Sequence, residues 1–251
     1  MKNKNQYIDS NNIALLLPSY NEEKHIAPVI KSCAKYNLDI IVVDDGSTDN
    51  TPKILDELKK DPNLKLIVLR HETNKGKGEA LKTGFSFVIN NNYFGVITLD
   101  ADGQHNIEEI KDFLLEINKN NPDIIVGSRF GNTKGMPFTR LLANYITSWI
   151  ISLISFKKIN DVQSGFRFIK SNVIKKIKLE TSNFDTESEI LIKASWNKYN
   201  ITNVPIKTIY FPNEFKSHIN PVKDTLKFFV LLAKSISWRI QFKKDNWLLD
   251  H

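Results

Sequence analysis

The chain has 251 residues, of which 41% are apolar and 25% are charged, a composition that excludes an intrinsically disordered protein. The single cysteine, Cys33, excludes a disulfide framework or a cysteine-based metal cluster and fits a reducing compartment. The net charge is +7, but residues 1–125 carry 15 Lys and Arg against 19 Asp and Glu, whereas residues 126–251 carry 20 against 9. The basic half predicts an anionic partner, and nucleic acid, an anionic membrane surface and a phosphorylated substrate all qualify.

Apolar runs alternate with helical patterns along the first half of the chain. We expect strands at residues 13–17, 40–43, 65–69, 95–99 and 124–126, and helices at residues 22–36, 51–60, 78–90 and 107–118. This alternation predicts an α/β fold in which helices flank a mostly parallel central sheet. Residues 1–12 are polar and lack the apolar core of a signal peptide, so we interpret them as a flexible tail before a domain at residues 13–220.

Clusters of polar residues follow several of the expected strands at the point where each strand ends. They lie at residues 18–22, 44–49, 100–105 and 127–129. Parallel α/β sheets bind ligands beyond the carboxyl ends of their strands, and these ends meet at one edge of the sheet. The sequence therefore predicts a binding site at this edge, built from segments that lie far apart along the chain.

Asp100 and Asp102 stand on either side of Ala101, directly after an expected strand. Two carboxylates this close repel each other unless a positive charge lies between them, and Mg²⁺ or Mn²⁺ prefers such oxygen ligands. Gln104 offers a further, neutral oxygen. The alternative is an acidic turn that caps a helix starting near Asn106, since acidic residues are common at helix starts. The residues alone leave both interpretations open.

Two further loops carry groups that can bind a nucleotide. In residues 44–49, a carboxylate can bind a ribose hydroxyl or a base N–H, while we expect Ser47 or Asp49 to cap the helix that follows. In residues 74–78, two glycines let the backbone approach a phosphate at a helix N-terminus. This glycine pattern is neither a P-loop nor a complete dinucleotide fingerprint, so by itself it does not identify a ligand.

The regular alternation ends near residue 130, and two amphipathic segments follow. Residues 141–156 carry a helical stripe of large apolar side chains between basic flanks. Residues 221–244 show a similar pattern of apolar and basic residues. The first segment is shorter than the ~20 apolar residues of a membrane-spanning helix. We expect helices that either pack on the core or lie at a membrane surface, with a possible interface helix at residues 138–156 and a basic amphipathic C-terminal helix at residues 221–251.

Several motifs occur together in the order and at the intervals of one enzyme family. They are PSYNE at residues 18–22, VVDDGSTD at 42–49, NKGKG at 74–78, DADGQ at 100–104 and GSR at 127–129. Together they resemble the family 2 glycosyltransferases, which have the GT-A (nucleotide-diphospho-sugar transferase) fold. The segment DVQSGFR at residues 161–167 narrows the resemblance to the branch similar to dolichyl-phosphate mannose and glucose synthases, and the resemblance covers roughly residues 13–235.

The resemblance implies a metal-dependent enzyme that holds a UDP- or GDP-sugar. The residues that it assigns to the donor are Pro18, Tyr20, Glu22, Asp45, Lys75, Asp100 and Ala101. Asp100, Asp102 and Gln104 would face a Mg²⁺ or Mn²⁺ ion and the diphosphate. The residues that it assigns to the acceptor phosphate are Arg129, Ser164 and Arg167, and those assigned to catalysis are Asp102, Arg129 and Arg167. Glu187 is a weaker site candidate, and residues 216–218 are interpreted as a loop that closes over the diphosphate.

The implied acceptor is a polyprenyl phosphate, and the implied product has an inverted anomeric configuration. A phosphate oxygen is already ionised near neutral pH, so this nucleophile needs positioning more than a general base, and a metal ion stabilises the charge of the leaving nucleoside diphosphate. We expect the protein in the cytoplasm, peripherally bound at the cytoplasmic face of a membrane. A soluble glycan or protein acceptor is the alternative. A nucleic-acid partner is not expected, because no nucleic-acid-binding motif appears.

Overall fold

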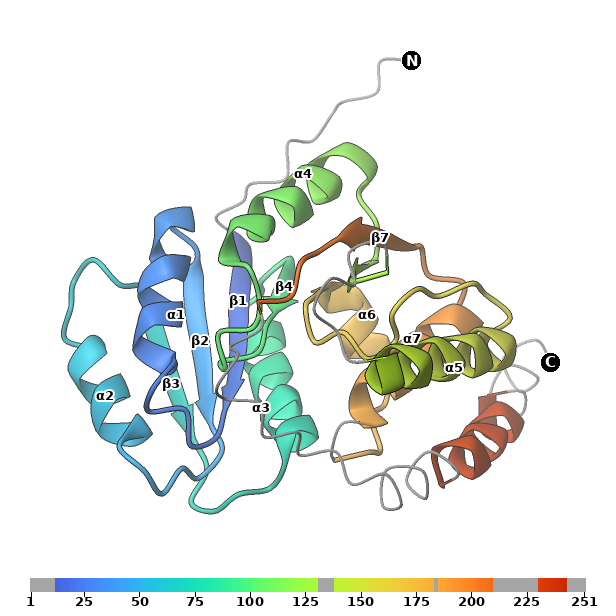
Figure 1. Ribbon diagram of the computed structural model, residues 1–251, viewed down its shortest axis with the longest axis horizontal. Coiled ribbons are helices and arrows are strands. Elements are labelled where there is room, and N and C mark those ends of the chain that lie inside the picture. The colour runs from blue at the N-terminus through green and yellow to red at the C-terminus, as the bar shows by residue number, and fades with distance from the viewer. Residues whose placement is uncertain (1–11, 131–137, 183–184, 210–229, 243–251) are drawn as a thin grey trace. The chain divides into compact units, whose positions relative to one another are not determined.

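The computed structural model describes residues 12–130, 138–182, 185–209 and 230–242, and Figure 1 shows their helices and strands. The chain divides into two compact units, residues 1–210 and 211–251. The first unit contains the sheet and every site residue discussed below. In the second unit, residues 230–242 are helical, and they form part of the C-terminal helix expected at residues 221–251. Nearly all of the expected N-terminal tail lies outside the described residues.

A seven-stranded sheet forms the centre of the first unit. In chain order its strands are β1 (Ile13–Ser19), β2 (Asp39–Asp44), β3 (Leu66–Arg70), β4 (Gly95–Thr98), β5 (Ile124–Ser128), β6 (Arg167–Lys170) and β7 (Ile201–Pro205). Their spatial order is β3-β2-β1-β4-β6-β5-β7. Neighbouring strands run parallel, except that β6 is antiparallel to both β4 and β5. The mostly parallel sheet predicted from the sequence is confirmed.

Helices flank this sheet, as Figure 1 shows. They are α1 (Ile26–Cys33), α2 (Thr51–Leu58), α3 (Lys77–Asn90), α4 (Ile110–Asn120), α5 (Phe138–Ser155), α6 (Ser171–Lys176) and α7 (Asp185–Trp196), with 3₁₀ turns at Ala34–Tyr36 and Ile107–Glu109. Leu15 and Leu17 of β1 share a core with side chains of α1, α2 and α4, and Cys33 is fully buried in it, as expected. Alternate side chains point to the other face, where Gly84 of α3 approaches Leu16 so closely that a Cβ would lie 2.3 Å from the leucine Cδ1.

Several local features differ from the predicted elements, and one of them is the parallel strand β7, which was not predicted. The first helix begins at Ile26 instead of residue 22, because Asn21 has a left-handed φ of 56° and the N–H groups before the helix bond to side chains of another loop. The four-residue strand β6 was not predicted, and it separates β4 from β5. The ends of β4 and β5 therefore lie at the same edge of the sheet, with the start of β6 between them.

Candidate active site

The segments for which the sequence predicts a function meet at the carboxyl edge of the sheet. Strands β1, β2, β4 and β5 end at this edge, and β6 begins there because it runs the other way. Pro18 lies within β1 and is half-buried. Asp100 follows β4, Arg129 follows β5 and Arg167 begins β6. Burial raises the pKa of Asp100, and the charges of Lys77 and, more weakly, Arg129 lower it, so Arg129 at the end of β5 acts on the carboxylate that follows β4.

The loops that follow β1 and β2 are joined by hydrogen bonds from backbone to side chain. The N–H groups of residues 21, 22 and 23 donate to Ser47 Oγ (2.9 Å), Thr51 Oγ1 (2.8 Å) and Asp49 Oδ2 (3.1 Å). Asp49 also accepts the first N–H of α2 (2.9 Å). Of Ser47 and Asp49, the two residues expected to cap this helix, Asp49 is therefore the one that bonds to its first residue. These bonds hold in place the loop that carries Tyr20 and Glu22. The Tyr20 side chain is 43% exposed.

Asp45 is buried and uses both carboxylate oxygens to hold the glycine loop at residues 74–76. It accepts the N–H groups of Lys75 (2.9 Å) and Gly76 (2.8 Å), and His71 Nδ1 lies 2.6 Å from one oxygen. The Lys75 side chain itself is exposed. Asp45 therefore shapes the loop that was predicted to approach a phosphate, and its two oxygens already contact three partners.

Lys77, the first residue of α3, bridges two carboxylates from distant parts of the chain. Its Nζ lies 2.6 Å from Asp100 Oδ1 and 3.0 Å from Oε1 of the buried Glu187 on α7. Burial opposes the ionisation of Asp100, yet the charges of Lys77, His105 and Arg129 lower its pKa to about 2. Burial also opposes the charge of Lys77, but Asp100 and Glu187 raise the pKa of that ammonium. Asp100 and Lys77 are therefore both ionised at neutral pH.

The surroundings of Asp102 stabilise its ionised carboxylate less than the surroundings of Asp100 do. Its Oδ1 accepts the N–H of Gln104 (2.9 Å), while burial and then the charge of Asp100 raise its pKa. A hard divalent cation takes oxygen ligands and relieves the repulsion between two carboxylates, so the residues present fit Mg²⁺ or Mn²⁺. Within the described part of the chain no group of three or more His, Cys, Asp or Glu could hold a metal ion. Substrate oxygens would therefore have to complete the shell of such an ion.

The turn after Asp102 excludes the capping interpretation of the acidic pair. Asn106 caps the next helical turn, because its side chain accepts the N–H of Glu108 (3.2 Å). The two aspartates are thus not used as caps. His105 accepts the N–H of Asp100 at Nδ1 (3.1 Å) and stacks on Phe166, and burial lowers the pKa of the imidazole. His105 supports the backbone of Asp100 as a hydrogen-bonding residue.

Arg129 forms a buried, two-pronged ion pair with Asp161. Its Nε and Nη2 lie 2.7 and 2.6 Å from the two carboxylate oxygens, and its backbone N–H donates to the same carboxylate at 2.8 Å. Paired bonds of this kind restrict the relative orientation of both groups. The pair connects the end of β5 to the segment at residues 161–167, which we call the acceptor turn after the role that the family resemblance implies for it.

Arg167 is almost fully buried and satisfies carbonyl oxygens of the acceptor turn and α7. It donates to the carbonyls of Ser164 (2.7 Å), Val162 (2.5 Å) and Glu187 (2.5 Å). Burial lowers the pKa of the guanidinium, and nearby acidic groups counteract this. Its predicted contact with a phosphate stays a prediction. Ser164 Oγ, in contrast, is buried and has no hydrogen-bond partner among the described residues.

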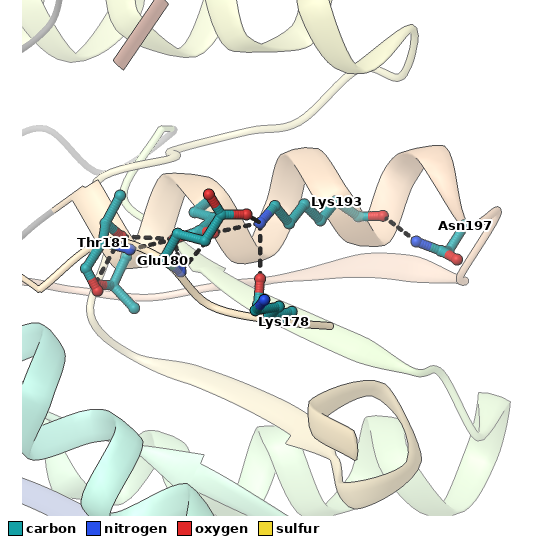
Figure 2. A network of polar contacts seen from close by, with 7 residues as sticks. Lys178, Glu180, Thr181, Lys193 and Asn197 are labelled. Atoms are coloured by element: carbon teal, nitrogen blue, oxygen red, sulfur yellow. Dashed lines mark hydrogen bonds and ion pairs between the residues drawn. The ribbon is translucent and has the colours of Figure 1, made fainter. Parts of the chain in front are cut away.

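A network of polar contacts holds the start of α7, as Figure 2 shows. The fully buried carboxylate of Glu189 accepts the N–H groups of Glu180 (2.9 Å) and Thr181 (2.9 Å). Lys193 Nζ lies 2.5 Å from Glu189 and donates to the carbonyl of Lys178 (2.7 Å). The Glu189 carboxylate has its partners within this network. We therefore interpret the cluster as structural support for α7, the helix that carries Glu187.

Sequence reasoning missed two residues that contact Asp100. Lys77 lies in the glycine loop, from which only Lys75 was selected. Gly165 of the acceptor turn packs on the carboxylate, where a Cβ would lie 2.8 Å from Asp100 Oδ2. The glycine loop was a signal for Lys77, but no local signal identified Gly165. The loop expected to close over the diphosphate, residues 216–218, lies outside the described residues.

A family model for glycosyl transferase family 2 matches residues 14–178 of the chain. The chain belongs to this family. A UDP-N-acetylglucosamine–dolichyl-phosphate N-acetylglucosaminyltransferase of Methanococcus voltae is 39% identical to this glycosyltransferase over 255 aligned positions, which cover 95% of the chain and 98% of the relative. A dolichol-phosphate mannosyltransferase of Pyrococcus furiosus is 31% identical over 77% of the chain and 55% of its own length.

A solved structure shares the fold of this glycosyltransferase. Glucosyl-3-phosphoglycerate synthase of Mycobacterium tuberculosis, in complex with Mn²⁺, UDP and phosphoglyceric acid, aligns with a TM-score of 0.67 at 16% identity. The alignment covers 89% of this glycosyltransferase and 78% of the synthase. Together with the family match and the sheet topology, this likeness confirms the predicted GT-A fold.

Proposed function

We propose that this glycosyltransferase moves a sugar from a nucleoside diphosphate to a polyprenyl phosphate, with inversion at the anomeric carbon. The observation that carries the proposal is the contact between the Asp100 carboxylate and Gly165, which joins a cation-binding carboxylate to the acceptor turn. The Methanococcus voltae relative spans nearly the whole chain and is named for transfer to dolichyl phosphate, which supports this class of acceptor.

On the donor side, we assign the diphosphate to a divalent cation held by Asp100, Asp102 and Gln104. Mg²⁺ or Mn²⁺ supplies positive charge that stabilises the leaving nucleoside diphosphate. Lys77 keeps the Asp100 carboxylate in place through its 2.6 Å contact. The remaining residues proposed to line the nucleotide are Pro18, Tyr20, Glu22, Asp45, Lys75 and Ala101.

On the acceptor side, the Ser164 hydroxyl is the group that is free to bind a phosphate oxygen, since it is buried and has no partner in the described structure. Arg129 and Arg167 place two positive charges around the same turn, and in the described arrangement their guanidinium groups bond to Asp161 and to backbone carbonyls. We propose that they act through this charge and by shaping the turn, and that a direct contact with phosphate requires them to exchange those bonds. The acceptor oxygen is ionised near neutral pH, so the reaction needs no general base.

A transfer assay tests this function. The full chain is incubated with Mn²⁺ or Mg²⁺, a polyprenyl phosphate in detergent, and radiolabelled UDP-N-acetylglucosamine, UDP-glucose or GDP-mannose. We expect label in the organic phase with one of these donors, and loss of that label when EDTA is added. Label that never enters the organic phase contradicts the proposal. Transfer to a glycan or protein in water would instead select a soluble acceptor.

The proposed acceptor also sets where the protein acts. Because a polyprenyl phosphate resides in a bilayer, we propose that the enzyme attaches peripherally to a membrane, at its cytoplasmic face. No part of this proposal requires the enzyme to bind nucleic acid.

A further inference from the structure

The first turn of α3 packs directly against the segment that leads into α7. Gly78 leaves no room for a side chain there, because a Cβ would lie 2.7 Å from the carbonyl oxygen of Ser182. Lys77 precedes this glycine, so the close packing fixes the backbone from which its side chain extends. From this position the Lys77 ammonium contacts Glu187 on α7 and Asp100 after β4.

Both oxygens of the Asp100 carboxylate have close neighbours. Lys77 Nζ lies 2.6 Å from Oδ1, whereas His105 Nε2 lies 3.8 Å from Oδ2. Oδ2 also faces Gly165, where a Cβ would lie 2.8 Å from it. The Asp100 side chain is still 30% exposed, so an ion from solvent can reach the carboxylate. A divalent cation that binds this carboxylate therefore arrives beside an ammonium that is already there.

Two carboxylates hold Lys77 in its charged form. Burial opposes the charge, but Asp100 and Glu187 raise the pKa of the ammonium. Glu187 Oε1 lies 3.0 Å from Nζ, and the Glu187 side chain is only 9% exposed. A buried carboxylate that loses its partner is strongly destabilised. Lys77 is therefore retained by Glu187 beside the cation site when Asp100 binds another positive charge.

We propose that Lys77 is an internal counter-ion of the cation site, where it competes with Mg²⁺ or Mn²⁺ for the Asp100 carboxylate. Like charges repel at short range, and a carboxylate that already contacts an ammonium attracts a second cation less strongly. The Lys77 ammonium keeps Asp100 ionised in the free enzyme and lowers the affinity of the site for the cation. Oxygens of the donor diphosphate then supply the ligands that retain the ion. The inference rests on the donor site proposed above, but cation binding is measured without sugar transfer.

A titration of the full chain with Mn²⁺, without nucleotide or acceptor, tests this competition. The electron paramagnetic resonance signal of free Mn²⁺ reports how much of the ion is bound. Lys77→Met removes the ammonium. Lys82→Met is the matched control, because Lys82 lies more than one turn farther along α3 and pairs with Glu79. Glu187→Gln has the opposite purpose, since it leaves Asp100 as the remaining carboxylate of the two that contact Lys77.

The variants should differ in the sign of their effect. We expect Lys77→Met to bind Mn²⁺ at least about tenfold more tightly than the unmodified chain, because a repelling charge is removed. Glu187→Gln should bind Mn²⁺ about three- to tenfold more weakly, because the site loses a negative charge and Lys77 turns to Asp100 alone. Lys82→Met should change the affinity by less than about twofold. Adding Glu187→Gln to Lys77→Met should reverse part of the gain.

Two results overturn the competition. The first is a Lys77→Met variant that binds Mn²⁺ no more tightly than the unmodified chain. The second is an equal gain in Lys77→Met and Lys82→Met, which would reflect net charge and not the contact with Asp100. If Lys77→Met does not fold, Glu187→Gln decides, because unchanged or tighter Mn²⁺ binding by this variant also overturns the competition.

The inference and the proposed function fail in different ways. Mn²⁺-dependent transfer to a polyprenyl phosphate, with equal Mn²⁺ affinity in all variants, leaves the function intact and removes the competition. The expected order of Mn²⁺ affinities in a chain that transfers no sugar to a polyprenyl phosphate supports the competition and removes the acceptor. No Mn²⁺ binding by any of the proteins, with or without UDP, removes the cation site and the inference with it.

Discussion

Asp102 is the residue on which the metal assignment depends most directly. Its carboxylate is destabilised as an anion, because burial and the charge of Asp100 raise its pKa. We predict that Asp102→Asn lowers kcat at least about 100-fold, since the leaving diphosphate loses its electrostatic stabilisation. The free energy of unfolding should stay within about 0.5 kcal/mol or rise, because the variant removes a strained charge. Glu57→Gln, exposed on α2, is the control, and unchanged turnover in Asp102→Asn would refute the assignment.

Lys77 supplies a second test at the residue scale. Its ammonium lies between Asp100 and Glu187, and its side chain is 18% exposed. Lys77→Met leaves the buried Glu187 carboxylate and the partly exposed Asp100 carboxylate without this partner, so urea denaturation should show a loss on the order of 3 kcal/mol in the free energy of unfolding.

The matched control for Lys77 is Lys82→Met on the same helix. Lys82 pairs with Glu79, which is 34% exposed, so its removal should cost less than about 1 kcal/mol. Adding Glu187→Gln to Lys77→Met should recover part of the stability. A loss in Lys77→Met no larger than in the control would show that the bridge does not stabilise the fold.

Cys33 gives a prediction about pH. Burial raises the pKa of this thiol from 9.0 to about 12. In the unfolded chain the thiol ionises first, so this residue costs stability as the pH rises from about 9 to 12 and has no such effect below that window. At pH 8 the native thiol should not react with Ellman's reagent, and it should react fully in urea. Rapid reaction of the folded protein would contradict the buried position.

The sequence predicted some of these residues better than others. Asp100 and Asp102 were found because a motif directly after a strand identifies the edge of the sheet. Arg167 was interpreted as a phosphate ligand because the family resemblance of residues 161–167 implies that role. The structure gives it three carbonyl acceptors, since buried carbonyl groups of a tight turn need donors.

At the scale of elements, the acceptor turn and strand β4 meet at Gly165. A Cβ at this position would lie 2.8 Å from Asp100 Oδ2, so Gly165→Ala displaces either the carboxylate or the turn. We predict a fall in kcat/KM of about 10- to 100-fold, because small misplacements of reacting groups cost this much. The melting temperature should change little, since the carboxylate is partly exposed and can move.

Gly95→Ala is the contrasting variant at the other end of β4. Its Cβ would lie 2.6 Å from Phe168 in the core, so thermal denaturation should show a lower melting temperature while the folded enzyme keeps its kcat/KM. If Gly165→Ala kept full activity, the packing of the acceptor turn on Asp100 would not matter for transfer.

The elements themselves differ in how far the sequence predicts them. The first five strands were recognisable because each is a continuous apolar run followed by polar residues, whereas the parallel strand β7, ITNVP, was not predicted. Strand β6 was not, since its four residues, RFIK, are too few to show a period. The start of α1 was misplaced by four residues because the bonds that delay it come from Ser47, Asp49 and Thr51, which no local pattern connects to it.

At the scale of the whole molecule, the two halves of the chain differ in net charge and in the ligands that we propose for them. The acidic first half contains the carboxylates proposed to hold the cation and the donor. The basic second half contains the acceptor turn, for which we propose a lipid phosphate. Composition could predict an anionic partner, but only the family connects it to a lipid.

The central claim is inverting transfer to a lipid phosphate at the Asp100 and Asp102 site, and NMR of the purified product tests it most directly. With an α-linked UDP-sugar, Mn²⁺ and a polyprenyl phosphate, we predict a β-linked sugar phosphate on the lipid, formed by the unmodified chain and not by Asp102→Asn or in EDTA. A product with retained configuration, or a sugar linked to anything other than the phosphate, would contradict the account.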